Sequence, residues 1–248
     1  MRISIITAAF NSSATIRETI ESVRMQRGVK VEHIVVDGGS LDDTIDIVRS
    51  YPHIQKTVSE PDKGIYDAMN KGIAMAEGDV IGILNSDDLY HDQEVLQKVC
   101  AVFSERDVDV AYGDLVYFSA GDMDKVVRYW KAGRYREGLF KWGWMPPHPT
   151  FFVRRQAYER YGLFNLDIGT SADYELMLRL MHIHALRWAY IDRVLVRMRE
   201  GGASNITMAA RFEANRNDRK AWTLNGVRPY WFTMYLKPLR KVGQYLFK

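Results

Sequence analysis

Residues 78–90 read Gly-Asp-Val-Ile-Gly-Ile-Leu-Asn-Ser-Asp-Asp-Leu-Tyr, and this stretch decides the fold. Its apolar run, residues 80–84, is rich in β-branched side chains and predicts a strand that is buried on both faces. Four polar residues, Asn85 to Asp88, follow where this strand leaves the sheet, which is the edge where open α/β sheets bind ligands. Two adjacent carboxylates repel each other unless a cation or ligand donors lie between them. The stretch therefore predicts either a ligand site or a solvated turn that caps the next helix.

The preceding residues alternate between predicted strands and predicted helices. Apolar β-branched runs predict strands at residues 3–7, 31–36 and 56–59, and apolar residues at helical spacing predict helices over residues 16–23, 45–48 and 65–76. Thr15 with Glu18, and Ser40 with Asp43, match capping boxes at the start of the first two helices. The alternation predicts an α/β fold with a mostly parallel central sheet and right-handed crossovers. We expect residues 1–90 to form a nucleotide-binding half.

The pattern changes after residue 90. Helices are predicted at residues 95–103, 156–161 and from 172 onward, and strands at residues 108–118, 150–153 and within 188–199. Residues 128–135 are aromatic and basic without clear alternation, and residues 142–149 hold three prolines, which exclude regular structure there. We expect residues 91–205 to form an acceptor half, so that residues 1–205 make one domain.

The composition narrows the class of protein. The chain has 248 residues, of which 47% are hydrophobic and 26% charged, as in ordinary globular proteins. Cys100 is the single cysteine, which excludes an internal disulfide and suits a reducing compartment. A net charge of +3 does not indicate nucleic-acid binding, and no apolar stretch approaches the ~20 residues that a membrane-spanning helix needs.

Acidic residues occur at three predicted strand ends: Asp37, the pair Glu60 and Asp62, and the pair Asp87 and Asp88. These ends converge along one edge of a doubly wound sheet. Carboxylate oxygens there suit a nucleotide together with Mg²⁺ or Mn²⁺. The sequence has no Gly-x-x-x-x-Gly-Lys-Ser/Thr, which excludes a P-loop, and no Gly-x-Gly-x-x-Gly after the first strand, which disfavours a dinucleotide oxidoreductase.

Four segments carry a resemblance to a known family. They are Ser-Ile-Ile-Thr (4–7), Val-Val-Asp-Gly-Gly-Ser-Leu-Asp-Asp-Thr (35–44), Asp-Lys-Gly-Ile-Tyr-Asp-Ala-Met-Asn-Lys-Gly (62–72) and Leu-Asn-Ser-Asp-Asp (84–88). In this order they resemble the successive motifs of family 2 inverting glycosyltransferases, which have the GT-A fold. Residues 147–152 and 171–176 resemble segments of bacterial members that build surface polysaccharides. The resemblance covers roughly residues 1–205.

The resemblance implies an enzyme that moves a sugar from a nucleotide-diphosphate donor, expected to be a UDP-sugar, with Mn²⁺ or Mg²⁺ as cofactor. Asp87 would contact the cation, and Asp88 would share this role because Asn85 replaces the first aspartate of the family's Asp-x-Asp motif. The residues implied to line the nucleotide are Thr7, Ala8, Phe10, Asp37, Asp62, Lys63, Asn70, Asn85 and Ser86.

The resemblance also implies a catalytic base. An acceptor hydroxyl loses a proton as it attacks the anomeric carbon, and a carboxylate within hydrogen-bond reach takes it. Asp173 is the implied base, with Ala172 in place of the first acid of the family's pair, and a plain helix cap is the alternative. His148, Trp144 and Ser204 are candidates for contact with the acceptor or the diphosphate. Core packing is the alternative for Trp144.

Residues 206–248 mix aromatic and basic side chains. Such a segment is typical of a helix that lies in a membrane interface, and the alternative is a terminal helix packed on the domain. The resemblance implies a lipid-linked oligosaccharide acceptor in polysaccharide biosynthesis, which favours membrane contact. We therefore expect a cytoplasmic enzyme that is peripheral on the inner face of the cell membrane.

Two other functions stay open at this point. A nucleotidyltransferase that makes sugar nucleotides would normally have a Gly-rich basic loop after the first strand, and Ala-Ala-Phe-Asn (8–11) lacks this feature. A catalytically silent sugar-binding subunit is supported by Asn85 and Ala172, each of which replaces an expected acid.

Overall fold

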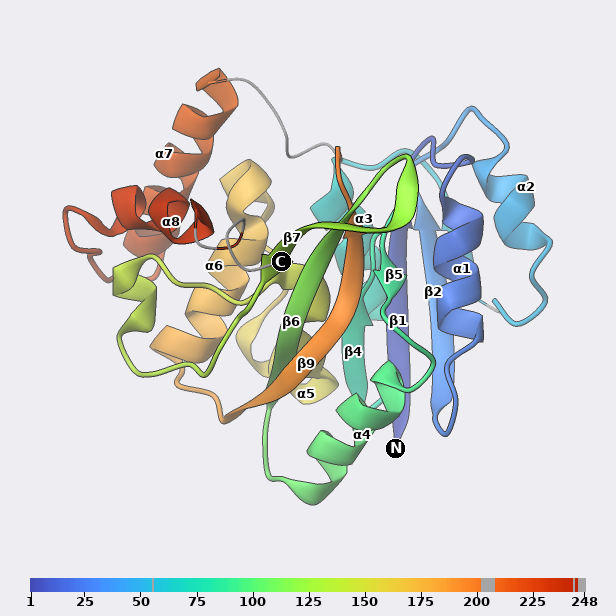
Figure 1. The fold of residues 1–248 in the computed structure, drawn as a ribbon, viewed down its shortest axis with the longest axis horizontal. Coiled ribbons are helices and arrows are strands. Elements are labelled where there is room, and N and C mark those ends of the chain that lie inside the picture. The colour runs from blue at the N-terminus through green and yellow to red at the C-terminus, as the bar shows by residue number, and fades with distance from the viewer. Residues whose placement is uncertain (55, 202–207, 243, 245–248) are drawn as a thin grey trace.

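The first ninety residues form a parallel sheet with connecting helices in the computed structural model, which describes residues 1–54, 56–201, 208–242 and 244 (Figure 1). The strands run in the order β3-β2-β1-β4, and each neighbouring pair is parallel. This order places all four carboxyl ends at one edge of the sheet. The elements are β1 (Arg2–Ala9), α1 (Ile16–Arg24), β2 (Lys30–Asp37), α2 (Thr44–Arg49), β3 (Lys56–Ser59), α3 (Ile65–Met75) and β4 (Val80–Ile83).

The later residues extend the same sheet with mixed strand directions. The described strands continue in the order β8-β6-β9-β5 beyond β4, and β7 pairs with β6. β8 is antiparallel to both β4 and β6, whereas β6 and β9 are parallel. The elements are β5 (Leu89–Tyr90), α4 (Val95–Glu105), β6 (Val110–Ser119), β7 (Asp122–Trp130), β8 (Phe152–Arg154), α5 (Arg155–Tyr161), α6 (Ala172–Leu178), β9 (Trp188–Arg199), α7 (Met208–Leu224) and α8 (Thr233–Val242).

Short helical turns lie between these elements. Three 3₁₀ turns span Leu139–Trp142, His148–Thr150 and Leu166–Ser171, and a π-helical turn, Arg179–Ile183, extends α6. The first ends where the proline-containing stretch begins, and the second lies at the end of that stretch.

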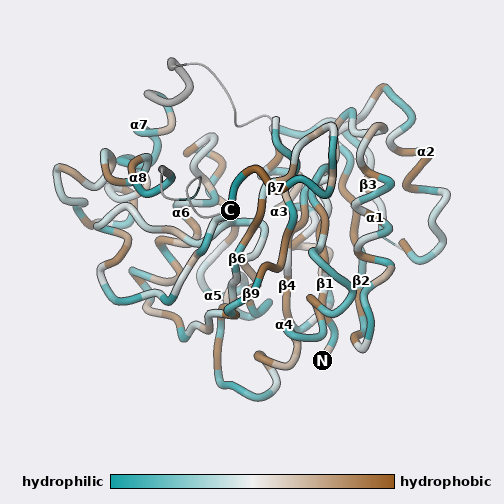
Figure 2. The backbone as a smooth tube through the Cα atoms, viewed as in Figure 1, coloured by the Kyte–Doolittle hydropathy of each residue, from teal (hydrophilic) through white to brown (hydrophobic). Residues whose placement is uncertain are grey.

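Two hydrophobic layers cover the sheet. On one face, Ile6 and Ile34 of the sheet belong to the same buried cluster as Met69 of α3 and Leu176 of α6. On the other face, α4 packs against β1, and α1 packs against β2. Figure 2 shows hydrophobic segments in the central strands and hydrophilic segments in the outer loops. The α/β fold predicted from the strand–helix alternation is therefore confirmed, with a sheet that is parallel in its first half and mixed in its second.

The predicted capping boxes are wrong. Thr15 and Asp43 precede α1 and α2, but neither side chain makes a capping hydrogen bond. Glu18 forms an ion pair with Arg199 of β9 instead, and Ser40 donates a hydrogen bond to Asp37. A distant partner thus takes the Glu18 side chain, and a contact within the preceding loop takes that of Ser40.

The carboxyl-terminal helices pack on the domain. The buried Trp222 of α7 donates from its indole nitrogen to the hydroxyl of Tyr174 in α6 at 2.9 Å. Thr233 at the start of α8 donates to the carbonyl of Lys141 at 2.6 Å. Among the described residues, no helix combines the length and apolar character that crossing a membrane requires.

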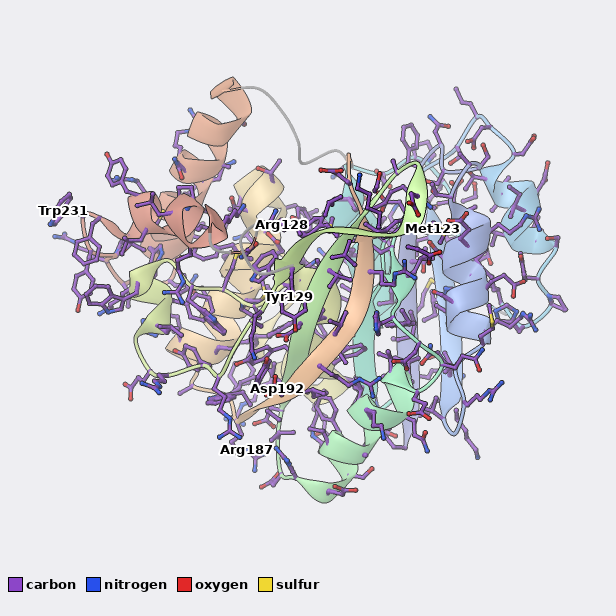
Figure 3. All side chains as sticks on the ribbon, viewed as in Figure 1. Met123, Arg128, Tyr129, Arg187, Asp192 and Trp231 are labelled. Atoms are coloured by element: carbon purple, nitrogen blue, oxygen red, sulfur yellow. The ribbon has the colours of Figure 1, made fainter. Side chains whose placement is uncertain are left out.

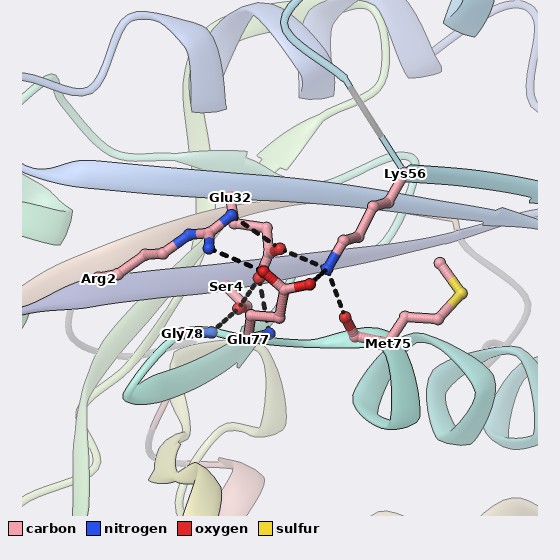
Figure 4. Close-up of polar contacts among 7 residues, drawn as sticks. All are labelled: Arg2, Ser4, Glu32, Lys56, Met75, Glu77 and Gly78. Carbon is pink, nitrogen blue, oxygen red and sulfur yellow. Dashed lines mark hydrogen bonds and ion pairs between the residues drawn. The ribbon is translucent and has the colours of Figure 1, made fainter.

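A charged cluster closes the amino ends of the strands (Figure 4). Glu32 of β2 has a buried side chain that accepts from Arg2 at 2.9 Å and from Ser4 at 2.5 Å, and Lys56 lies 2.9 Å away. The backbone N–H of Glu77 donates to the same carboxylate at 2.8 Å. Burial raises the pKa of Glu32, but these hydrogen bonds outweigh it, so the pKa is lower than usual. The cluster ties β1, β2 and β3 to the end of α3.

Candidate active site

Asp37 ends β2 and organises the loop that follows. Its buried carboxylate accepts from the backbone N–H groups of Gly39 at 3.2 Å and Ser40 at 3.0 Å, and from the hydroxyl of Ser59 at 2.6 Å. Because Ser59 ends β3, Asp37 joins the carboxyl ends of two neighbouring strands. This loop forms one wall of the candidate site.

Gly38 brings the β3 loop close to this wall. A Cβ atom at Gly38 would lie 2.5 Å from Oδ2 of Asp62 and 3.4 Å from the ring of Phe10. A side chain at residue 38 would therefore displace the Asp62 carboxylate from its present position. Three loops, which follow β1, β2 and β3, meet there, as their shared strand edge predicts.

The Asn85–Asp88 turn follows β4 at the same edge. Asn85 donates from Nδ2 to Oδ2 of Asp88 at 3.0 Å, and the backbone N–H of Asp88 donates to the carbonyl of Asn85 at 3.1 Å. The Ser86 hydroxyl lies 2.8 Å from that of Ser12, which connects the turn to the β1 loop. Oδ1 of Asn85 and Oδ1 of Asp88 are buried and have no hydrogen-bond partner.

The two aspartates of this turn are electrostatically unusual. Burial raises the pKa of Asp87, and the positive charge of Arg199 opposes the shift only partly. Burial and the neighbouring charge of Asp87 raise the pKa of Asp88 well above its usual range. A cation bound beside these two carboxylates would offset their mutual repulsion and would accept the oxygen atoms that have no hydrogen-bond partner.

The donor atoms at this turn fit a hard divalent cation. Asp87, together with the unpartnered oxygens of Asn85 and Asp88, supplies the oxygen ligands that Mn²⁺ and Mg²⁺ prefer. Over residues 1–54, 56–201, 208–242 and 244, no group of three or more His, Cys, Asp or Glu side chains is arranged to hold a metal ion. A cation at this turn would thus need further ligands, and phosphate oxygens of a nucleotide are of the right type.

Asp173 lies in the first turn of α6, and its Oδ1 accepts from the backbone N–H of Tyr174 at 2.7 Å. Tyr66 of α3 lies beside it: burial raises the pKa of Tyr66, and the charge of Asp173 raises it further. The rings of His148 and Tyr66 both contact the ring of Phe164, with centroid distances of 5.6 and 5.4 Å. Burial lowers the pKa of His148, and the charge of Asp173 partly opposes that shift. The structure thus groups Asp173, Tyr66 and His148, which come from three separate segments.

Other predicted residues have their side chains engaged in the fold. The hydroxyl of the fully buried Thr7 lies 3.0 Å from Nε2 of His33. Asn70 makes two 2.9 Å hydrogen bonds to the backbone of Phe164 and so connects α3 to the loop after α5. Trp144 is 4% exposed and donates to the carbonyl of Ala132 at 2.7 Å, in agreement with its core-packing alternative.

The remaining predicted residues differ in exposure. Ala8 is buried in β1, Phe10 is 61% exposed, and Lys63 is exposed in the loop before α3. Phe10 and Lys63 are thus open to a ligand at the strand edge. Ser204 lies outside the described residues.

Two residues near the site were not predicted. Tyr66 lies within one of the family-like segments, but nothing in its spacing indicates a neighbour in α6. Arg199 ends β9, where it forms an ion pair with Glu18 and lies over the Phe118 ring at 5.0 Å. A single sequence gives no signal that β9 returns to the turn after β4.

Comparisons with known proteins agree with this geometry. Residues 4–162 match the family model described as "Glycosyl transferase family 2". An uncharacterized glycosyltransferase of Mycobacterium tuberculosis is 35% identical over 187 residues, which cover 71% of this chain and 68% of the relative. A PGL/p-HBAD biosynthesis glycosyltransferase of the same species is 30% identical over 222 residues, which cover 84% of this chain and 81% of the relative.

Two solved structures share the fold. The S. aureus TarS 1–349 structure in complex with UDP-GlcNAc has a TM-score of 0.69 at 18% identity, and the match covers 91% of this chain and 65% of that one. The mannosyltransferase PcManGT from Pyrobaculum calidifontis, in complex with GDP-Man and Mn²⁺, has a TM-score of 0.65 at 20% identity, with coverages of 94% and 67%. The present chain thus spans about two thirds of each of these structures.

Proposed function

Since this chain belongs to glycosyl transferase family 2, we propose that it is an inverting, metal-dependent hexosyltransferase whose donor is a nucleoside diphosphate sugar, in the first place a UDP-sugar. The observation that carries the proposal is the presence of two groups of side chains. One group, at the carboxyl edge of the sheet, offers oxygens without partners, and the other offers the Asp173 carboxylate beside Tyr66 and His148.

The donor would lie along the carboxyl edge of the sheet. The Asp37 loop, Phe10, Asp62 and Lys63 would surround the base and ribose, and Asn85 with Ser86 would lie near the diphosphate. Asp87, aided by Asp88, would hold the cation. When bound, the cation neutralises charge that develops on the departing diphosphate. The complexes of similar folds with UDP-GlcNAc, and with GDP-Man and Mn²⁺, support this assignment.

Asp173 would act as the general base. The acceptor oxygen forms a bond to the anomeric carbon while its proton moves to a carboxylate oxygen of Asp173. The bond between the anomeric carbon and the diphosphate oxygen breaks at the same time, and the nucleoside diphosphate leaves with the bonding electrons. Attack opposite to the departing group inverts the anomeric configuration. Tyr66 and His148 would position the carboxylate.

The acceptor would be a lipid-linked oligosaccharide in bacterial surface-polysaccharide biosynthesis, with the enzyme cytoplasmic and peripheral on the inner face of the membrane. Large apolar side chains near α8 support contact with a bilayer, since interfacial segments combine such side chains with cations. Trp231 is 79% exposed and projects outward (Figure 3). Other exposed members are Trp142, Tyr230, Tyr235 and Leu239. The segment after residue 205 would thus pack on the domain and also contact the membrane.

Vesicle flotation tests the membrane contact. The variant Trp231→Ala/Leu239→Ala removes two of the most exposed apolar side chains and should partition less to anionic vesicles than the unaltered protein. Equal partitioning of the two proteins would contradict membrane contact through this surface.

An assay of donor hydrolysis tests the catalytic proposal. A panel of nucleotide sugars is incubated with the protein and Mn²⁺, and release of the nucleoside diphosphate is measured. Asp173→Asn should bind UDP as the unaltered protein does but lose roughly 10²–10⁴-fold in turnover, because general-base catalysis contributes about this much. Asp46→Asn on α2 is the matched control. Normal turnover by Asp173→Asn would contradict the assignment of the base.

A further inference from the structure

A pocket of about 410 Å³ lies between α8, the end of β7 and residues 143–145 of the proline-containing stretch. We call it the α8 pocket. Gly143 permits it: a Cβ atom there would lie 2.5 Å from the backbone nitrogen of Lys237, so α8 approaches the loop only because residue 143 has no side chain. Trp130, Trp144 and Met145 form the apolar part of its lining.

The charged part of the lining is entirely cationic. Lys237 and Arg240 lie about one turn apart on α8, and Lys241 follows Arg240. Lys131, directly after β7, also lines the pocket, and its ammonium group lies 3.7 Å from the Asp192 carboxylate. The lining includes no acidic side chain. Lys237 is paired with Asp218 at 2.7 Å, whereas Arg240 and Lys241 form no ion pair with any residue in the described ranges. The pocket therefore presents positive charge beside an apolar wall.

The α8 pocket adjoins the candidate base. The ammonium group of Lys237 lies 3.9 Å from the ring centroid of Tyr174, the residue next to Asp173. Burial and the cations Lys237 and Arg128 lower the pKa of Lys241, and the charges of Asp218 and then Asp173 oppose this shift. An acceptor that occupies the pocket would thus have another part near Asp173.

We propose that the α8 pocket binds the phosphate-bearing head of the acceptor, with Arg240 and Lys241 at the phosphate and the aromatic wall at the first carbons of the lipid. This inference rests on the proposed function, since it names the acceptor class for the same site. A phosphate or diphosphate carries more negative charge than a carboxylate and suits several clustered cations. A free sugar would use the aromatic wall but leave the cations unneutralised.

Isothermal titration with farnesyl diphosphate, farnesol and inorganic pyrophosphate tests the proposal. The titrations are done with the full chain in a buffer without divalent cations. The unaltered protein should bind farnesyl diphosphate at least tenfold more tightly than either farnesol or pyrophosphate. Only farnesyl diphosphate has both a charged head for the cations and an apolar chain for the aromatic wall. Arg240→Gln/Lys241→Gln should lose roughly tenfold or more in affinity for farnesyl diphosphate, since charge-assisted hydrogen bonds to phosphate are lost.

Two control variants distinguish binding in the α8 pocket from binding elsewhere on the protein. Lys98→Gln, on the outer face of α4, removes one cation far from the pocket and should bind farnesyl diphosphate normally. Lys63→Gln, which removes the exposed cation of the donor site, should also bind it normally, which excludes capture by that site. Unchanged affinity in Arg240→Gln/Lys241→Gln, or equal affinity for farnesol and farnesyl diphosphate, would overturn the proposal. Titration with UDP and Mn²⁺ tests the proposed function separately, so the two can fail independently.

Discussion

The two ends of the parallel sheet hold polar clusters of opposite character. At the amino ends, the Glu32 carboxylate is surrounded by donors, and its pKa is lower than usual. At the carboxyl ends, Asn85 and Asp88 have buried oxygens without partners, and the pKa values of Asp87 and Asp88 are raised. The first cluster is complete and stabilises the fold. The second is incomplete within the protein, as expected of residues that bind a ligand.

The largest effect on stability should come from the amino end. Glu32→Ala leaves the donors of Arg2, Ser4 and Lys56 without their shared acceptor and should lower the free energy of unfolding by about 2–3 kcal/mol. Affinity for UDP should not change. Urea unfolding measures the first quantity and isothermal titration the second.

Glu77→Ala is the matched control for Glu32→Ala. Glu77 contacts the same two cations, but its side chain is 62% exposed. Its removal should cost much less stability, because solvent screens exposed ion pairs. A loss equal to that of Glu32→Ala would show that burial is not the reason for the contribution of Glu32.

Tyr66→Phe should show that polar contacts near the carboxyl edge affect turnover more than stability. The Tyr66 hydroxyl donates to the carbonyl of Thr170 at 3.2 Å, three residues before Asp173. Removing it should lower kcat by roughly tenfold, which corresponds to the loss of one hydrogen bond that positions the start of α6. KM for the donor should change little, and the pH profile of kcat should shift as the environment of Asp173 changes. An unchanged kcat and pH profile would show that Tyr66 contributes only to packing and not to turnover.

Asp88→Asn should change the stability of the protein in the opposite direction to Glu32→Ala. A neutral amide is easier to bury than a carboxylate whose Oδ1 has no partner, so the metal-free variant should be about 1 kcal/mol more stable at neutral pH. The increase in Tm on addition of Mn²⁺ should become smaller. Destabilisation of the metal-free variant would show that the Asp88 carboxylate stabilises the fold, as that of Glu32 does.

Acidification should affect the two ends of the sheet differently: UDP binding at the carboxyl end should weaken a few-fold before the amino-end cluster loses its contribution to stability. Asp87 must be deprotonated to bind a cation, and its pKa is raised above 3.8, so Mn²⁺-dependent UDP binding should weaken at a higher pH than for an ordinary aspartate. The pKa of Glu32 is lowered from 4.5, so its contribution to stability is present above 4.5 and is lost as the pH falls through the lower folded value. Titrations and unfolding curves between neutral pH and pH 4.5 should show weaker binding while the fold persists.

Much of the fold could be predicted because its signals are local. Buried parallel strands such as β1, β2 and β4 are continuous apolar runs, and α3 has a clear hydrophobic face. β7 was not predicted as a strand because the polar residues in its first half lack a buried face. The mixed direction of the later strands is a property of long-range pairing, which the order of elements along the chain does not specify.

The site could be predicted only where a single segment supplies its residues. The Asn85–Asp88 turn and Asp37 follow directly from strand ends. Thr7 and Asn70 match family-like segments, but their side chains contact His33 and the backbone of Phe164, partners that are distant in sequence. The approach of Tyr66 to Asp173 likewise depends on how α3 and α6 pack.

Isothermal titration of UDP in the presence and absence of Mn²⁺ tests the central claim, that the carboxyl-edge oxygens hold a cation and a diphosphate. Mn²⁺ should increase UDP affinity in the unaltered protein and equally in Glu32→Ala, whereas Asp87→Ala should show no increase. Retention of Mn²⁺-dependent UDP affinity by Asp87→Ala would contradict the claim.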